Sequence, residues 1–93
     1  MPYIKQEKRK PIDAQINFLE HLIPTSGELN YTITKLCLAY IEQRGLCYGT
    51  INDIVGVLEC AKMEFNRRLI ANYEDTKIKE NGDVIGYEKE SKN

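Results

Sequence analysis

One long segment with helical periodicity, residues 50–80, constrains this sequence more than any other feature. Thr50 suits the N-cap, with the acidic Asp53 three residues later, and Asn81 and Gly82 provide a stop signal. A helix of about 30 residues is roughly 45 Å long, which exceeds the ~26 Å diameter of a compact domain of this size. We therefore expect part of its apolar face to be covered by another subunit. Its apolar residues recur every three or four positions at Ile51, Ile54, Val55, Leu58, Ala61, Phe65, Leu69, Ile70 and Tyr73.

Two shorter helices are expected before this segment. The first has Pro11 in its first turn and ends near residue 23. For the second, Thr25 is the expected N-cap and Glu28 completes a capping box, while Gly45 follows its last turn. Because only residues 46–49 separate the second and third helices, we expect a long antiparallel helical hairpin. The predicted fold is all-α, a short N-terminal helix followed by this hairpin, assembled into an oligomeric bundle.

The chain divides into three predicted parts. Residues 1–10 are a basic N-terminal arm, residues 11–82 are the helical domain, and residues 83–93 are a flexible C-terminal tail. Within the tail, residues 84–87 fit either a short strand or a clip onto a neighbour. Ninety-three residues bury a thin core, which again favours a dimer or higher oligomer.

The bulk composition excludes some classes of function. A net charge of −1 gives no global attraction to nucleic acid or to an anionic membrane. There is no membrane-spanning apolar run and no secretory signal, so we expect a cytoplasmic protein. The three cysteines are expected to be reduced and buried. The single histidine, His21, has no second metal ligand paired with it in the sequence. No metal or cofactor is predicted. The cysteines are Cys37, Cys47 and Cys60.

Five polar or aromatic residues are candidate ligand-binding residues. Arg67 and Arg68 are able to bind a phosphate or carboxylate, and Tyr73 is able to stack on a ring. Asn30 and Asn52 would add hydrogen bonds if two subunits form a common groove. The alternative is that the arginines are solvated and form intrahelical ion pairs, for example with the glutamate four residues before Arg68.

Sequence motifs typical of enzymes are not found. The chain has no glycine-rich phosphate loop and no nucleophile elbow. The all-α nucleotide pyrophosphohydrolases hold magnesium with E-x-x-E and E-x-x-D motifs. Here Glu28 is followed by Tyr31, and Glu59 is followed by Lys62, so those ligands are missing. We therefore expect a protein that is not an enzyme.

Four blocks of the sequence form a distinctive pattern: GELNY at 27–31, NDIVGVLE at 52–59, EFNRR at 64–68 and YEDTKI at 73–78. In these blocks the sequence resembles a family of small uncharacterised proteins from phages, prophages and bacterial genomes. The family pattern leads us to expect a proline before the last block, where this chain has Asn72, which favours a continuous helix.

The resemblance implies a phage or mobile-element context, hence the cytoplasm of a host cell. The first functional hypothesis is a non-enzymatic binding protein: an inhibitor of a host defence component, or a protein that sequesters an anionic nucleotide. The second is a nucleic-acid-binding regulator that uses the basic arm and the two arginines. The third is a structural or assembly component. In each case a homo-oligomer is expected.

Overall fold

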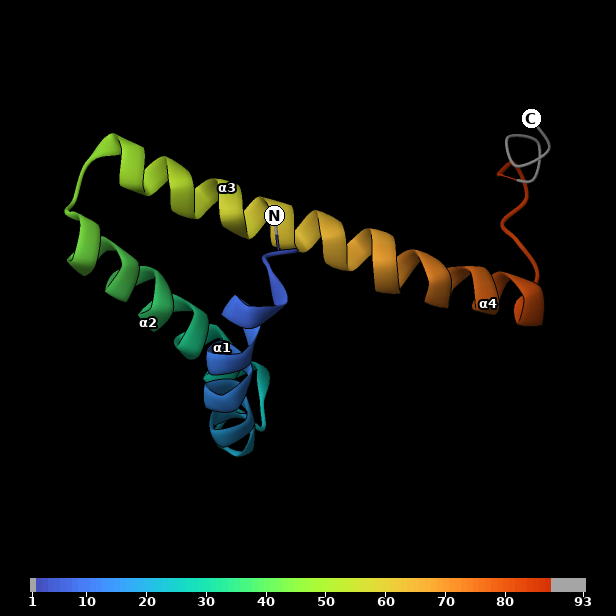
Figure 1. The fold of residues 1–93 in the computed structure, drawn as a ribbon. Helices are drawn as coiled ribbons and strands as arrows, with labels where there is room; N and C mark the ends of the chain where they lie inside the picture. The colour runs from blue at the N-terminus through green and yellow to red at the C-terminus, as the bar shows by residue number, and fades with distance from the viewer. Residues whose placement is uncertain (1, 88–93) are drawn as a thin grey trace. The chain divides into compact units, whose positions relative to one another are not determined.

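The computed structural model describes residues 2–87, and this part of the chain is all-α and contains no strand (Figure 1). The chain forms two compact units, Met1–Glu59 and Cys60–Asn93. The all-α prediction is therefore confirmed. Among residues 2–87, no helix combines the length and the apolar character needed to cross a bilayer.

The first unit opens with α1 (Gln6–Leu19), which is followed by a short 3-10 turn, η1 (Glu20–Leu22). The helix starts at Gln6, so the predicted boundary of the basic arm at residue 10 lies inside it. Pro11 is inside the helix rather than in its first turn. The early start reflects the Lys, Arg, Glu and Gln residues of this stretch, which are good helix formers. Arg9 also donates from Nε to the carbonyl of Ile4 at 2.6 Å, which holds the preceding chain.

The second helix, α2 (Ser26–Arg44), has the predicted ends. Thr25 is the N-cap, with extended backbone angles of φ −129° and ψ 167°. The reciprocal capping box is not formed, because the Thr25 hydroxyl donates to the Glu28 carboxylate instead of accepting from a backbone N–H. At the other end, Gly45 takes φ 92°, a left-handed value that favours glycine, and donates to the carbonyl of Ile41 at 2.7 Å.

The third helix, α3 (Tyr48–Phe65), begins earlier than its sequence signals predict. Thr50 lies in its first turn and is not the N-cap, so that prediction is wrong. The Cys47 carbonyl accepts from the N–H of Ile51 at 3.0 Å, which makes Cys47 the residue that precedes the helix. Thr50 is instead covered by the turn and has an exposed fraction of 6%, the only buried residue among those described.

Figure 1 shows α2 and the first part of α3 leaving their connection at Gly45 and diverging along their lengths. The structure does not show them packed side by side as the closed antiparallel hairpin that the short connection predicts. Within this unit, the two helices are arranged as an open V (Figure 1).

The second unit continues the helical run. Phe65 ends α3, a π-helical segment η2 (Asn66–Ile70) follows, and α4 (Ala71–Asn81) completes it. The N–H of Ala71 donates to the carbonyl of Asn66, five residues back, so the single regular helix predicted for residues 50–80 is interrupted by one wider turn.

The helical run ends at the predicted stop signal. Gly82 has φ 85° and donates to the carbonyl of Ile78 at 2.8 Å. The chain then makes a turn in which Tyr87 donates from its N–H to the carbonyl of Val84 at 3.1 Å, rather than a strand. The rest of the predicted tail, residues 88–93, lies outside the described part.

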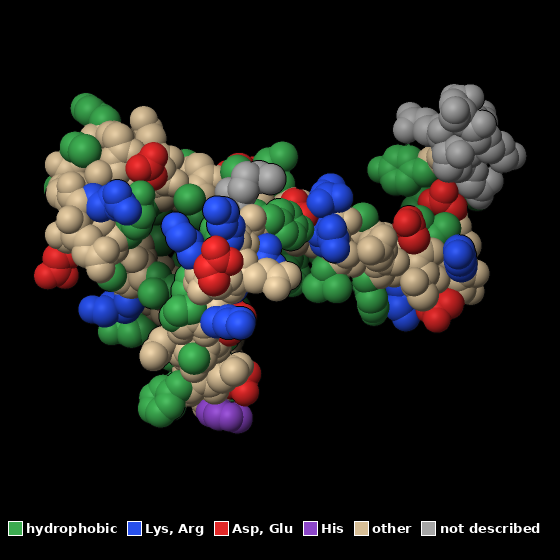
Figure 2. Space-filling model, in the orientation of Figure 1, with side chains coloured by type: hydrophobic (Ala, Val, Ile, Leu, Met, Phe, Trp, Pro, Cys, Tyr) green, Lys and Arg blue, Asp and Glu red, His purple; other side chains and the backbone are tan. Residues whose placement is uncertain are grey.

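The described residues contain no buried hydrophobic side chain in either unit. Large aliphatic and aromatic residues are exposed on all the main helices, and Figure 2 shows hydrophobic side chains over the visible surface of both units. Isolated exposed leucines are ordinary, but a fold without any buried one is not. The helices of this chain therefore leave their apolar faces uncovered.

Candidate binding cleft

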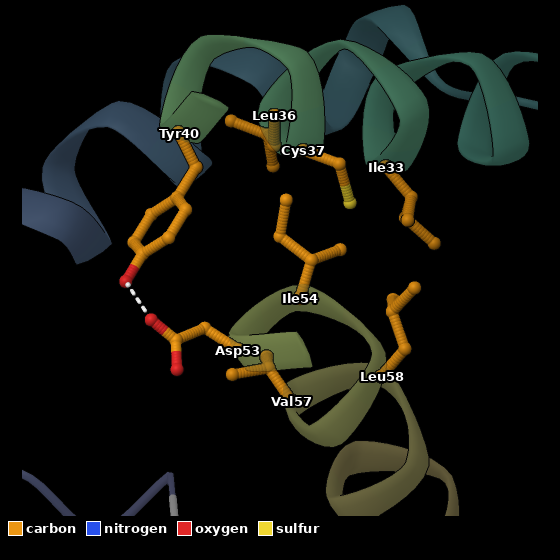
Figure 3. A pocket seen from close by; sticks show the side chains of 8 residues that line it. All are labelled: Ile33, Leu36, Cys37, Tyr40, Asp53, Ile54, Val57 and Leu58. Atoms are coloured by element: carbon orange, nitrogen blue, oxygen red, sulfur yellow. Dashed lines mark hydrogen bonds between the residues drawn. The ribbon is translucent and has the colours of Figure 1, made fainter. Parts of the chain in front are cut away.

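The open side of the V in the first unit is a cleft of about 240 Å³ between α2 and α3. Figure 3 shows Ile33, Cys37 and Tyr40 of α2 pointing across the cleft toward α3, and Ile54 pointing from α3 toward α2. Each helix contributes four lining residues, and their spacing of one, three or four positions places them on one face of that helix. The lining residues are Ile33, Leu36, Cys37 and Tyr40 from α2, and Asp53, Ile54, Val57 and Leu58 from α3.

The two walls of the cleft are largely open to solvent. Leu36 on α2 is 63% exposed, and Val57 on α3 is 62% exposed. Ile54, between the walls, is half-buried. An apolar surface that faces inward and remains exposed is typical of a groove that receives apolar side chains.

Polar contacts are confined to the narrow end of the cleft, near the connection. The Tyr40 hydroxyl donates to Oδ2 of Asp53 at 3.3 Å, which ties α2 to α3 across the V. On the same helix, the guanidinium of Arg44 lies 4.9 Å from the centre of the Tyr40 ring, within cation–π distance. These contacts fix the closed end and leave the rest of the cleft without a cluster of polar groups able to carry out acid–base or nucleophilic chemistry.

A second hollow lies beside the connection and contains Cys47. Its sulfur is 3.3 Å from the hydroxyl of Thr50. That hydroxyl, and then the backbone N–H groups of Thr50 and Gly49, lower the pKa of the Cys47 thiol, because each stabilises the thiolate. The nearby Asp53 charge acts in the opposite direction.

The expectation that the cysteines are buried is wrong. Cys47 and Cys60 are exposed, and Cys37 is half-buried in the wall of the cleft. No disulfide joins them. Apolar neighbours in the sequence suggested burial, but the faces on which they lie are uncovered in the chain alone. Among residues 2–87, no group of three or more histidine, cysteine or acidic side chains is placed to hold a metal ion.

The two candidate asparagines belong to the first unit and lie outside the cleft lining. Asn30 is exposed on α2, where its carbonyl accepts from the Thr34 hydroxyl at 2.9 Å. Asn52 is exposed in the second turn of α3. They contribute no side chain to the site that the geometry defines.

The other three candidates belong to the second unit. Arg67 donates to the Glu64 carboxylate at 2.6 Å, which is an intrahelical ion pair. Arg68 is exposed in η2, and the ammonium of Lys77 lies 5.5 Å from the centre of the Tyr73 ring. The structure thus places the candidates in two units and gives Arg67 and Tyr73 local partners. Their role in binding a ligand stays a prediction.

The cleft was not predicted from the sequence, although Ile54 and Leu58 of its lining were placed on the apolar face of the long helix. That face was expected to be covered in part by another subunit. Cys47 was missed because the start of α3 was placed at Thr50.

No curated protein and no solved structure matches this chain significantly. One family model does match, over residues 1–84, and this range includes every residue that lines the cleft and the whole of the long helical run. The chain therefore belongs to the family described as a domain of unknown function, DUF6899.

Proposed function

We propose that this protein is a non-enzymatic binding protein whose α2–α3 cleft receives an amphipathic helix of a protein partner. The single observation that carries the proposal is the apolar cleft itself, lined on both walls by helical faces that stay exposed. Grooves of this kind recognise helices through apolar side chains at intervals of three and four residues.

The energetics favour a protein occupant over a small anionic one. Full burial of a Leu, Ile or Val side chain is worth about 1.5–3 kcal/mol, so covering both walls of the cleft gives a substantial driving force. A phosphate, by contrast, requires cationic or N–H donors, and no lysine or arginine lines the cleft. The inhibitory and assembly roles expected for this protein both require such a protein-binding surface.

An occupant would also close the V formed by α2 and α3. With its cleft filled, α2 and α3 become the antiparallel pair of a helical bundle, in which the occupant supplies the missing helices. The Tyr40–Asp53 hydrogen bond then sets the angle between the two helices.

Photocrosslinking in the producing cell tests this function. Leu36 is replaced by p-benzoylphenylalanine, and the matched control carries the same group at Leu38, an exposed leucine of α2 that does not line the cleft. We expect a discrete adduct from position 36 and at most a faint one from position 38. If irradiation at position 36 yields no adduct of any protein, the cleft is not the binding surface and the proposal fails.

A further inference from the structure

We infer that the occupant of the cleft is a second copy of this chain, so that α2 and α3 of two protomers form a four-helix arrangement around the two clefts. The inference rests on the proposed function of the cleft and names its partner. It concerns the first unit alone.

The apolar walls of the cleft need to be covered whenever the chain is folded. Ordering each residue costs about 1–2 kcal/mol, and only burial of apolar surface offsets this on the scale required. The described residues bury no hydrophobic side chain. Another copy of the chain is present wherever the chain folds, and its concentration rises with that of the chain itself.

The cleft side of α2 and α3 presents on the order of 400 Å² of apolar surface per chain, at about 100 Å² per aliphatic side chain and about 200 Å² per tyrosine. Stable interfaces begin near 600 Å² per partner and are about 60% apolar, which requires about 360 Å². Two copies that meet at their clefts reach this requirement. The exposed residues that contribute most are Leu29, Ile33, Leu36, Ile51, Val57 and Leu58.

The cleft fits an amphipathic helix, and α2 of another copy is such a helix, with its apolar residues at Ile33, Leu36 and Cys37. If α2 of each protomer enters the cleft of the other, the same residues make the same contacts twice. Such a two-fold interface closes on itself and yields a dimer rather than a fibre. The polar pair Tyr40–Asp53 stays at the narrow end of the cleft, where it keeps its hydrogen bond.

Native mass spectrometry of the purified full chain, with equilibrium sedimentation across a dilution series, measures the association directly. We expect a species of twice 10.8 kDa. Specific complexes of standard size bind more tightly than a Kd of about 100 μM. A protein that stays monomeric up to that concentration would therefore overturn the inference.

Paired substitutions locate the interface. Leu36→Asp places a charge in the cleft, and Leu38→Asp makes the same change at a comparable exposure on the opposite side of α2, 53% against 63%. Val57→Asp and Val55→Asp form the same pair on α3, with exposures of 62% and 59%. We expect the cleft variants to weaken the dimer at least about 30-fold and the control variants less than about 5-fold. Equal effects within each pair would contradict the inference.

Cysteine labelling tests the same interface in the unaltered chain, so its result does not depend on whether a substituted variant folds. Cys37 lines the cleft, whereas Cys47 lies in the separate hollow beside the connection. On dilution from dimer to monomer, the rate of Cys37 alkylation should rise at least about tenfold while the Cys47 rate stays constant, because burial in the interface blocks reagent access. A constant Cys37 rate across the transition would place the interface elsewhere.

The outcomes separate this inference from the function on which it rests. A monomeric chain that still forms a discrete adduct from position 36 with a different protein leaves the cleft as a binding surface and refutes the second copy as its occupant. A dimer that forms without protection of Cys37, together with no adduct from position 36, refutes both.

Discussion

The two units of this chain hold their helices in different ways. In the first unit, α2 and α3 face each other across a cleft, and the polar link between them, Tyr40 to Asp53, joins residues far apart in sequence. In the second unit, several side-chain contacts of the helical run join residues three or four positions apart. They include Arg67 with Glu64, Lys77 with Glu80, and Asn72 with the carbonyl of Arg68.

This difference separates two sources of stability. Local pairs each contribute only a few tenths of a kcal/mol, but they act as soon as the helix forms. Apolar faces contribute several times more per side chain, but only when something covers them. If the proposed occupant fills the cleft, the first unit gains stability from apolar burial, whereas the local pairs of the second unit act within the chain alone.

The largest expected effect contrasts two isoleucines. Ile54→Ala, at the base of the cleft, should lower the free energy of unfolding by about 2 kcal/mol, and Ile78→Ala on α4 by less than about 1 kcal/mol, because Ile78 is already 41% exposed. Urea denaturation followed by circular dichroism at one fixed protein concentration measures both. Equal losses would show that the first unit does not depend on burial in the cleft.

The next effect tests the π-helical segment. Asn72 donates from its side-chain amide to the Arg68 carbonyl at 2.9 Å, one turn back, beside the wider turn of the helix. Asn72→Ala removes this hydrogen bond and should be less stable than Asn52→Ala by about 1 kcal/mol. Both variants exchange an exposed helical asparagine for alanine, so the difference in helix propensity cancels. If the two variants are equally stable, the Asn72 amide does not support the π-helical turn.

Most of the helix ends were predictable from sequence because they depend on local chemistry. Thr25 began α2, and Gly45 and Gly82 ended helices with the left-handed backbone that glycine favours. The start of α3 was misplaced because a threonine followed by an aspartate resembles a capping pattern, although the chain turns earlier, at Cys47.

The cleft and the wider turn could not be predicted for physical reasons. Apolar periodicity shows which face of a helix is to be covered, but it carries no information about what covers it. The π-helical turn at η2 differs from an α-helical one by a single hydrogen-bond register, and no residue pattern in NRRLI specifies that shift. Arg67, Arg68 and Tyr73 were correctly predicted to lie on the long helical run. Their contact partners could not be predicted in the same way, because these depend on the helical register around η2.

Cysteine reactivity offers a smaller contrast between the units, since Cys47 belongs to the first and Cys60 to the second, and both are exposed. The Thr50 hydroxyl lowers the Cys47 pKa, so its thiolate, the reactive form, accumulates at a lower pH. Iodoacetamide at pH 7 should therefore alkylate Cys47 several-fold faster than Cys60, as peptide mass spectrometry resolves. Thr50→Val should raise the Cys47 pKa and shift its rate profile to higher pH. Identical profiles with and without the hydroxyl would contradict this assignment.

The smallest expected effect concerns the two arginines of η2. Arg67→Ala removes the ion pair with Glu64 and should cost about 0.2–0.5 kcal/mol in low salt and less in 1 M NaCl, which screens exposed pairs. Arg68→Ala is the matched control, because it removes an exposed side chain of the same type one residue later. Without a ligand, it should lower the free energy of unfolding by less than Arg67→Ala does. If Arg68→Ala is instead the more destabilising variant in the assembled protein, the Arg68 guanidinium has a partner outside its own helix, and the predicted anion site at η2 regains support.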